Sequence, residues 1–154
     1  MNFQIINKST VKPIASGVIT AIGSDIIKHL VFALKKSHKN AFKKLDMADD
    51  VTLVFVGNAE MRKLNHQFRG KDKVTDILSF SPSEALSLGE LVFCVPVLKK
   101  QAKEHKLTIQ DEFTYLFIHG LLHLLDFDHE TSARAAHKMY AIQDAIFDKM
   151  TWKS

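Results

Sequence analysis

Residues 119–129 read HGLLHLLDFDH, and the rest of the chain must fold so that the histidines of this stretch are held together. It holds three of the eight histidines of the chain, in the spacing H-x3-H-x5-H. If its first part is helical, His119 and His123 lie one turn apart on one face and can reach the same metal ion. His129 would point away from that face, so the chain must turn back between Leu124 and His129. The spacing predicts a metal site made by the end of a helix and the turn after it.

Three neutral imidazoles suit zinc best, so we expect a single zinc ion per chain on His119, His123 and His129. Three protein ligands leave the fourth tetrahedral position open, as in catalytic zinc sites, where the pKa of a bound water falls to near 7. A fourth ligand from Asp128 or Glu130 would close the site and make it structural. The spacing alone does not decide between a catalytic and a structural site.

The motif is similar to that of the metzincin peptidases, H-E-x-x-H-x-x-G-x-x-H. Those enzymes use the glutamate as general base, and this chain has Gly120 in its place. Where they turn the chain at a glycine, this chain has Asp126, a residue that tolerates left-handed backbone better than most. A zinc metalloprotease is therefore the third candidate function.

The composition is that of one soluble globular domain spanning residues 1–154, with 46% hydrophobic and 25% charged residues. The net charge of +4 weakly favours a polyanionic partner such as RNA. Basic residues form two runs: Lys35, Lys36, Lys39, Lys43 and Lys44, and then Arg62, Lys63, Arg69, Lys71 and Lys73. Each run could equally be a solvated face.

The location indicated by the sequence is the cytoplasm. The N-terminus lacks the basic start and apolar core of a secretion signal, and the apolar residues 14–34 are interrupted by Asp25, Lys28 and His29. We expect neither export nor a membrane span. The single cysteine, Cys94, suits a reducing compartment and lies in an apolar run that predicts a core position.

The hydrophobic patterns predict an α+β fold: a small mixed sheet of about four strands packed with four to five helices. The strands are expected at residues 3–6, 51–56, 77–80 and 90–95. Helices are expected at residues 24–36, 58–68, 96–105, 108–124 and from 132 onward, with caps at Ser24, Asn58, Thr108 and Ser132 and with Met61, Leu64 and Phe68 facing inward. Residues 35–50 are expected to form a polar connector.

Two upstream segments extend the histidine motif: LNHQFRGKDKVTDILSF at residues 64–80 and LGELV at residues 88–92. Together the three segments resemble the YbeY family of bacterial rRNA maturation factors, over roughly residues 51–150. Two positions depart from the pattern of that family. Asp126 replaces its usual glycine, and Glu90 replaces its usual aspartate.

The resemblance implies a zinc-dependent, single-strand-specific endoribonuclease that acts in 16S rRNA 3′-end maturation and ribosome quality control. It implies His119, His123 and His129 as metal ligands and Arg69 as an essential residue. The implied partners are the 16S rRNA precursor and the ribosome, with ribosomal proteins as further candidates and neither DNA nor membrane. The main alternative is a ribosome-assembly factor that binds RNA and uses the metal structurally.

The residues agree with phosphodiester cleavage better than with peptide hydrolysis. Arg69 presents a planar donor fork that can clamp a phosphate, and Lys71 and Lys73 can hold flanking phosphates. If Arg69 does not bind phosphate, its charge would instead interact with the backbone carbonyls at the C-terminal end of its helix. No residue stands out in the sequence as a general base.

Overall fold

The computed structural model describes residues 1–151 and places β2 (Asp50–Val56) in the middle of a sheet. β1 (Asn2–Asn7) and β4 (Ser87–Cys94) pair with β2 in parallel, one on each side. β3 (Ile77–Phe80) pairs with β4 in the antiparallel direction, which gives the order β1-β2-β4-β3. The predicted mixed sheet of four strands is confirmed.

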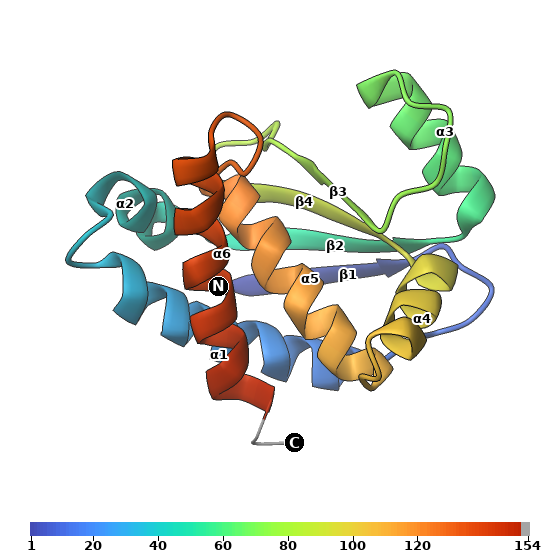
Figure 1. Ribbon diagram of the computed structural model, residues 1–154, viewed down its shortest axis with the longest axis horizontal. Helices are drawn as coiled ribbons and strands as arrows, with labels where there is room; N and C mark the ends of the chain where they lie inside the picture. The colour runs from blue at the N-terminus through green and yellow to red at the C-terminus, as the bar shows by residue number, and fades with distance from the viewer. Residues whose placement is uncertain (152–154) are drawn as a thin grey trace.

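Six helices pack with this sheet in the described part of the chain, one more than the upper end of the expected range. They are α1 (Ser16–Leu34), α2 (Lys39–Met47), α3 (Asn58–Arg69), α4 (Val95–Glu104), α5 (Ile109–Leu124) and α6 (Ala133–Thr151). Figure 1 shows α5 crossing the sheet with α6 beside it, and α3 apart from both at the other side. The fold is α+β and forms a single domain.

The two faces of the sheet carry cores of different size because successive side chains of a strand point to opposite faces. One face holds the large core, in which Phe55 and Phe93 stack and meet Phe113 of α5. The other face holds a small core that includes Val54 and Met61, the latter from α3. The large core fixes α5, and therefore the histidines that α5 carries.

The first fifty residues differ from the expectation. α1 begins at Ser16 with Ala15 as its N-cap, so Ser24 lies inside the helix and does not cap it. The apolar stripe extends further toward the N-terminus than expected, because Ile19 and Ile22 are buried with the rest of it. The expected connector contains α2, whose Leu45 is buried in the large core. By length and hydropathy, α1 is the one described helix that could span a membrane.

α3 also differs from the expectation, in its N-cap and in the direction of Phe68. Gly57 is its N-cap, and Asn58 is its first helical residue, whose Oδ1 accepts a hydrogen bond from the Sγ of buried Cys94. Phe68 does not face inward: it is 57% exposed, because the C-terminal half of α3 stands away from the sheet (Figure 1). Gly70 ends the helix in the left-handed conformation with φ +68°, as predicted.

The expected starts of the later helices are confirmed. Oγ1 of Thr108 accepts a hydrogen bond from the backbone N–H of Asp111 at 3.1 Å and begins α5. Oγ of Ser132 accepts one from the N–H of Ala135 at 3.0 Å and begins α6. Pro96 lies in the first turn of α4. These caps fix where α5 starts, and hence how far along the sheet its last turn lies.

A buried carboxylate ties α4 to α5 and gives a testable pH dependence. Oε2 of Glu112, which is 1% exposed, lies 2.9 Å from Nδ1 of His105. This hydrogen bond, together with the charge of Glu112, raises the pKa of His105. Because the pKa of His105 is higher in the folded protein than the value of about 6.5 expected in the unfolded chain, protonation of His105 stabilises the fold. This stabilisation is fully present below the unfolded pKa and is lost as the pH rises through the folded pKa.

We therefore expect His105→Asn to lower the melting temperature more near about pH 6 than near about pH 9. Thermal unfolding of wild type and variant, followed by circular dichroism at both pH values, measures this difference. An equal loss at both pH values would show that the His105–Glu112 pair contributes no pH-dependent stability.

Candidate metal centre

The three histidines of the motif converge at the C-terminal end of α5. Each offers one ligand nitrogen, and these nitrogens all lie within 4.8 Å of one another. The Nε2 atoms of His119 and His123 are 3.1 Å apart, as one helical turn allows. A single ion between the three could therefore be reached by all of them.

In the described part of the chain, this group of candidate ligands contains no carboxylate. Oδ1 of Asp128 instead accepts a hydrogen bond from the N–H of Glu130 at 2.8 Å. Oε1 of Glu130 faces Arg69 at 3.7 Å from Nη2. Neither carboxylate is among the candidate ligands, which favours an open fourth position.

The turn after α5 needs a left-handed residue, and Asp126 supplies it with φ +71°. The N–H of Phe127 then donates back to the carbonyl of Leu122 at 3.0 Å, which closes the helix end. This turn brings His129 back toward the helical pair. The reversal predicted from the spacing is therefore present, with aspartate in a position that glycine adopts more easily.

We expect Asp126→Gly to change the free energy of unfolding by no more than about 1 kcal/mol. Glycine relieves left-handed strain, while the lost contact between the exposed Asp126 carboxylate and Nζ of Lys44, 3.1 Å apart, is worth about 0–1 kcal/mol. Asp126→Ala keeps the strain and loses the contact, so it should be the less stable variant. Urea denaturation compares them, and a loss above about 2 kcal/mol in the glycine variant would give the carboxylate a role beyond the turn.

The protonation of the histidines fits metal binding. Burial lowers the pKa of His119, and burial together with the neighbouring His119 and His129 lowers the pKa of His123 to about 4. Both imidazoles are therefore neutral near pH 7, the form in which histidine binds a metal. The donor set and its protonation fit a zinc ion.

Gln143 is a site residue that the sequence reading missed. This side chain of α6 is fully buried, and its Oε1 lies 2.9 Å from Nδ1 of His119. Accepting from the Nδ1–H leaves Nε2 of His119 free as the metal ligand, a common support for ligating histidines. The sequence does contain a signal that Gln143 is buried, because this residue lies about one turn from Met139 and from Ile146 on the buried side of α6.

Tyr140 was also missed, and it covers the histidines from α6. Its ring centroid lies 6.0 Å from that of His119 and 5.7 Å from that of His129, with interplanar angles below 30° in both pairs. The side chain is 38% exposed, so one side faces the opening of the site. A half-exposed tyrosine beside a metal centre also presents a hydroxyl that can donate to a ligand.

Gly120 has a packing reason. A Cβ there would lie 2.7 Å from Cδ2 of Leu91 and 2.8 Å from Cδ1 of Ile77, so glycine allows α5 to approach the sheet closely. A glutamate at this position would point into the sheet and not toward the histidines. The structure therefore offers no place for the general base of the metzincins at Gly120.

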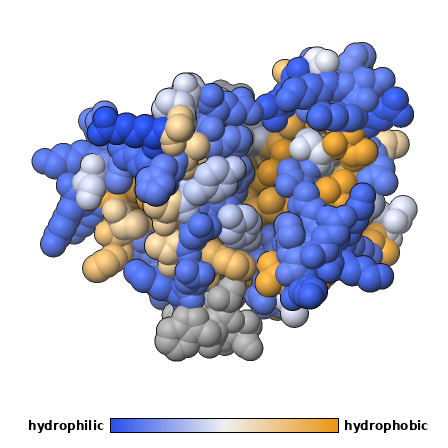
Figure 2. Space-filling view, viewed as in Figure 1, coloured by the Kyte–Doolittle hydropathy of each residue, from blue (hydrophilic) through white to orange (hydrophobic). Residues whose placement is uncertain are grey.

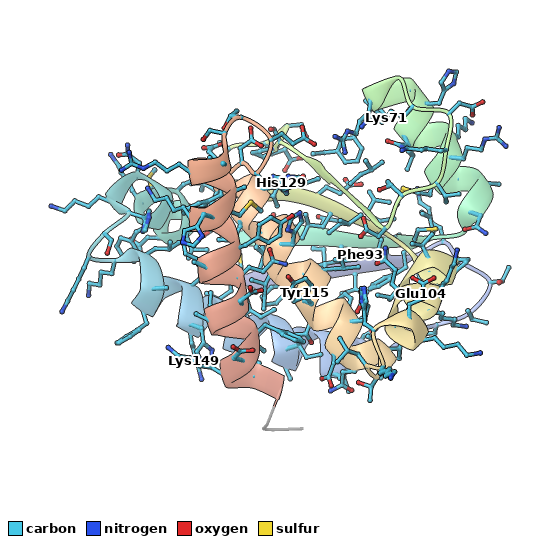
Figure 3. All side chains as sticks on the ribbon, viewed as in Figure 1. Lys71, Phe93, Glu104, Tyr115, His129 and Lys149 are labelled. Atoms are coloured by element: carbon cyan, nitrogen blue, oxygen red, sulfur yellow. The ribbon has the colours of Figure 1, made fainter. Side chains whose placement is uncertain are left out.

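The centre opens into a cleft of about 910 Å³ bounded by α5, the 126–130 turn and the end of α3. Figure 2 shows apolar surface on the floor of the hollow and hydrophilic surface around it. Figure 3 shows Lys71 on the α3 side and His129 on the opposite side. Arg69 lines the α3 side, and its 3.7 Å contact with Glu130 reaches across the cleft to the histidine turn.

Other residues singled out from the sequence are distributed unevenly. Lys71 and Lys73 are exposed in the turn after α3 and do not line the cleft. Lys36 and Lys39 line a second cavity of about 720 Å³, which shares the 126–128 turn with the first.

Glu90 is exposed on the sheet face opposite Gly120, away from the histidines. Asp76 also lines the cleft, and its negative charge partly opposes the burial that lowers the pKa of His119.

Fold and site together define a class: an α+β protein with three convergent histidines beside a large cleft, as expected of a hydrolase with a metal centre. Comparison with known proteins narrows this class. The family profile described as endoribonuclease YbeY matches residues 18–151. The chain belongs to the endoribonuclease YbeY family, whose members are nucleases that cleave RNA.

Similar proteins span most of the chain. An endoribonuclease YbeY of Bdellovibrio bacteriovorus is 48% identical over 115 residues, which are 75% of this chain and 77% of the relative. One from a Sulfurihydrogenibium species is 41% identical over 107 residues, 66% of this chain and 70% of the relative. The solution structure of TM1509 from Thermotoga maritima, 24% identical, has the same fold, with a TM-score of 0.61 over 96% of this chain and 87% of that one. The resemblance seen in the motifs is confirmed at the level of the family.

Proposed function

We propose that this chain is a zinc-dependent endoribonuclease that cleaves single-stranded RNA, with residues 1–154 acting as one catalytic domain. One observation supports the proposal most strongly. In a member of an RNA-cleaving family, three histidines converge beside a cleft and leave room for a further ligand. The proposed ligands are His119, His123 and His129.

When bound, the ion would supply Lewis-acid chemistry at the phosphate and a water made acidic near neutral pH. Residues of the chain would supply the rest. Gln143 keeps the proton of His119 on Nδ1, so that Nε2 stays available. The turn at Asp126, closed by the Phe127 N–H donating to the carbonyl of Leu122 at 3.0 Å, holds His129 toward the helical pair. The ligand set would thus be held in one geometry before an ion arrives.

Arg69 is the proposed phosphate clamp. It is 44% exposed and lines the cleft from the C-terminal end of α3. Its contact with Glu130 at 3.7 Å is longer than a hydrogen bond and largely exposed, so a phosphate can displace it at little cost. The guanidinium would then neutralise charge that builds up on the phosphate oxygens during cleavage.

The proposed biological role is 16S rRNA 3′-end maturation and ribosome quality control in the cytoplasm. It rests on the motif resemblance and on family membership. The 16S rRNA precursor and the ribosome, with ribosomal proteins among its components, are the proposed partners, and DNA and membranes are not. The net charge of +4 is consistent with an RNA partner.

Cleavage of a single-stranded RNA and of the same RNA annealed into a duplex tests the proposed activity. We expect the single strand to be cut, the duplex to be spared, cleavage to stop with a chelator, and added zinc to restore it. Cleavage that persists after complete removal of metal would contradict the metal dependence. Cleavage of the duplex at the same rate would contradict the single-strand preference.

The ribosome-assembly alternative has one observation in its favour. An ion on the three histidines would also fasten the turn containing Asp126 to the end of α5, which is a structural role. In that case the purified protein would bind RNA without cutting it, with or without zinc. The same experiment therefore separates the enzyme from the assembly factor.

A further inference from the structure

An exposed aromatic pair borders the cleft on the α3 side. Phe68, in the last turn of α3, packs its ring edge-on against Phe80 at the end of β3, with centroids 5.0 Å apart and planes at 76°. Both residues line the same cleft as the histidines. Phe68 is 57% exposed, so much of its ring is open to the cleft.

The fold has little need of Phe68. Met61 and Asn65 are the buried side chains of α3, and Leu64 packs at the edge of the small core. That core also gathers Phe80 at its edge, whereas Phe68 lies outside it. The exposed surface of Phe68 is therefore available to a ligand in the cleft.

The surroundings indicate what that ligand is. Arg69 follows Phe68 directly and is the proposed phosphate clamp, and Lys71 and Lys73 lie exposed in the next turn. A single-stranded nucleic acid offers bases and phosphates in alternation, and proteins bind it with aromatic rings for the bases and cations for the phosphates. An aromatic ring next to a guanidinium on one wall of a cleft matches that alternation.

We propose that Phe68, supported by Phe80, stacks on an unpaired nucleobase next to the phosphate held by Arg69. The platform deepens the proposed function and rests on it, because it names the part of the RNA that the α3 wall recognises. A base in a duplex is already stacked and paired, so it could reach the ring only at the cost of unstacking. Stacking on Phe68 therefore contributes to the preference for single strands.

The test compares cleavage kinetics of Phe68→Ala, Phe68→Leu and Phe68→Trp on a short single-stranded RNA with a mapped cleavage site. Loss of a stacking contact should raise KM by about tenfold, with kcat changed far less. Leucine keeps the apolar bulk but has no ring face, so it should behave like alanine. Tryptophan should restore or lower KM. Phe32→Ala, which removes an 81% exposed phenylalanine of α1, is the matched control and should leave both constants unchanged.

Substrates with one base removed at a time sharpen the test. For the wild type, one such abasic RNA should show the same increase in KM of about tenfold, and in Phe68→Ala that RNA and the intact RNA should behave alike. An unchanged KM in Phe68→Ala, wild-type behaviour in Phe68→Leu, or an abasic penalty that persists in Phe68→Ala would overturn the platform. A wild type that cuts no RNA would instead overturn the proposed function itself.

Discussion

His123→Ala should lose zinc and RNA cleavage together. His123 lies next to both other histidines, with its Nε2 3.1 Å from that of His119 and its ring centroid 5.0 Å from that of His129. Two imidazoles cannot hold an ion as three can. Because changes in residues that merely support metal ligands cost about 10- to 100-fold, removal of a ligand should lower cleavage at least about 100-fold.

Metal content by mass spectrometry and cleavage rate, measured on the same preparation, check this expectation. His123→Gln repeats the change with a polar side chain, in case the alanine variant is unstable. His137→Ala, an exposed histidine of α6 outside the group, is the control and should keep both metal and activity. Full zinc occupancy in the His123 variants would show that His123 is not a ligand.

Arg69→Glu should abolish cleavage while the fold and the bound metal stay intact. The side chain is 44% exposed and separate from the three histidines, so neither the core nor the ligand set depends on it. The new carboxylate would face Glu130 and the incoming phosphate with negative charge. Loss of one donor to a developing oxyanion costs about 100- to 1000-fold, and charge reversal should cost at least as much.

Single-turnover cleavage with a metal assay and a melting curve measures all three properties. Arg69→Lys keeps the charge but not the planar fork, so it should fall between wild type and glutamate. Lys99→Glu on α4 makes the same change in net charge away from the cleft and serves as the control. Undiminished cleavage by Arg69→Glu would remove this residue from the mechanism.

The fold was predictable where the pattern is local and strong. The apolar residues of β2 and the caps at Thr108 and Ser132 need no tertiary information to be recognised. The errors came where burial is decided by distant partners. α1 extends back to Ser16 because Ile19 meets the large core, and α2 forms in a polar stretch because Leu45 reaches the same core.

The candidate site divides in the same way. Spacing on one helix and a reversal after it were enough to bring together His119, His123 and His129. Gln143 lies 24 positions from His119, so no local pattern joins them, and the contact exists only because α6 packs on α5. Helical periodicity predicted that Phe68 faces inward. Periodicity cannot show that the C-terminal half of α3 stands away from the sheet.

We propose that one zinc ion on three histidines makes this chain a ribonuclease. Titration of metal-free protein with zinc, with the initial rate of single-stranded RNA cleavage followed at each step, tests it most directly. The rate should rise from background and level off at one equivalent of zinc per chain. Full cleavage before any zinc is added, or a rate that stays at background when one equivalent is bound, would contradict a zinc-dependent ribonuclease.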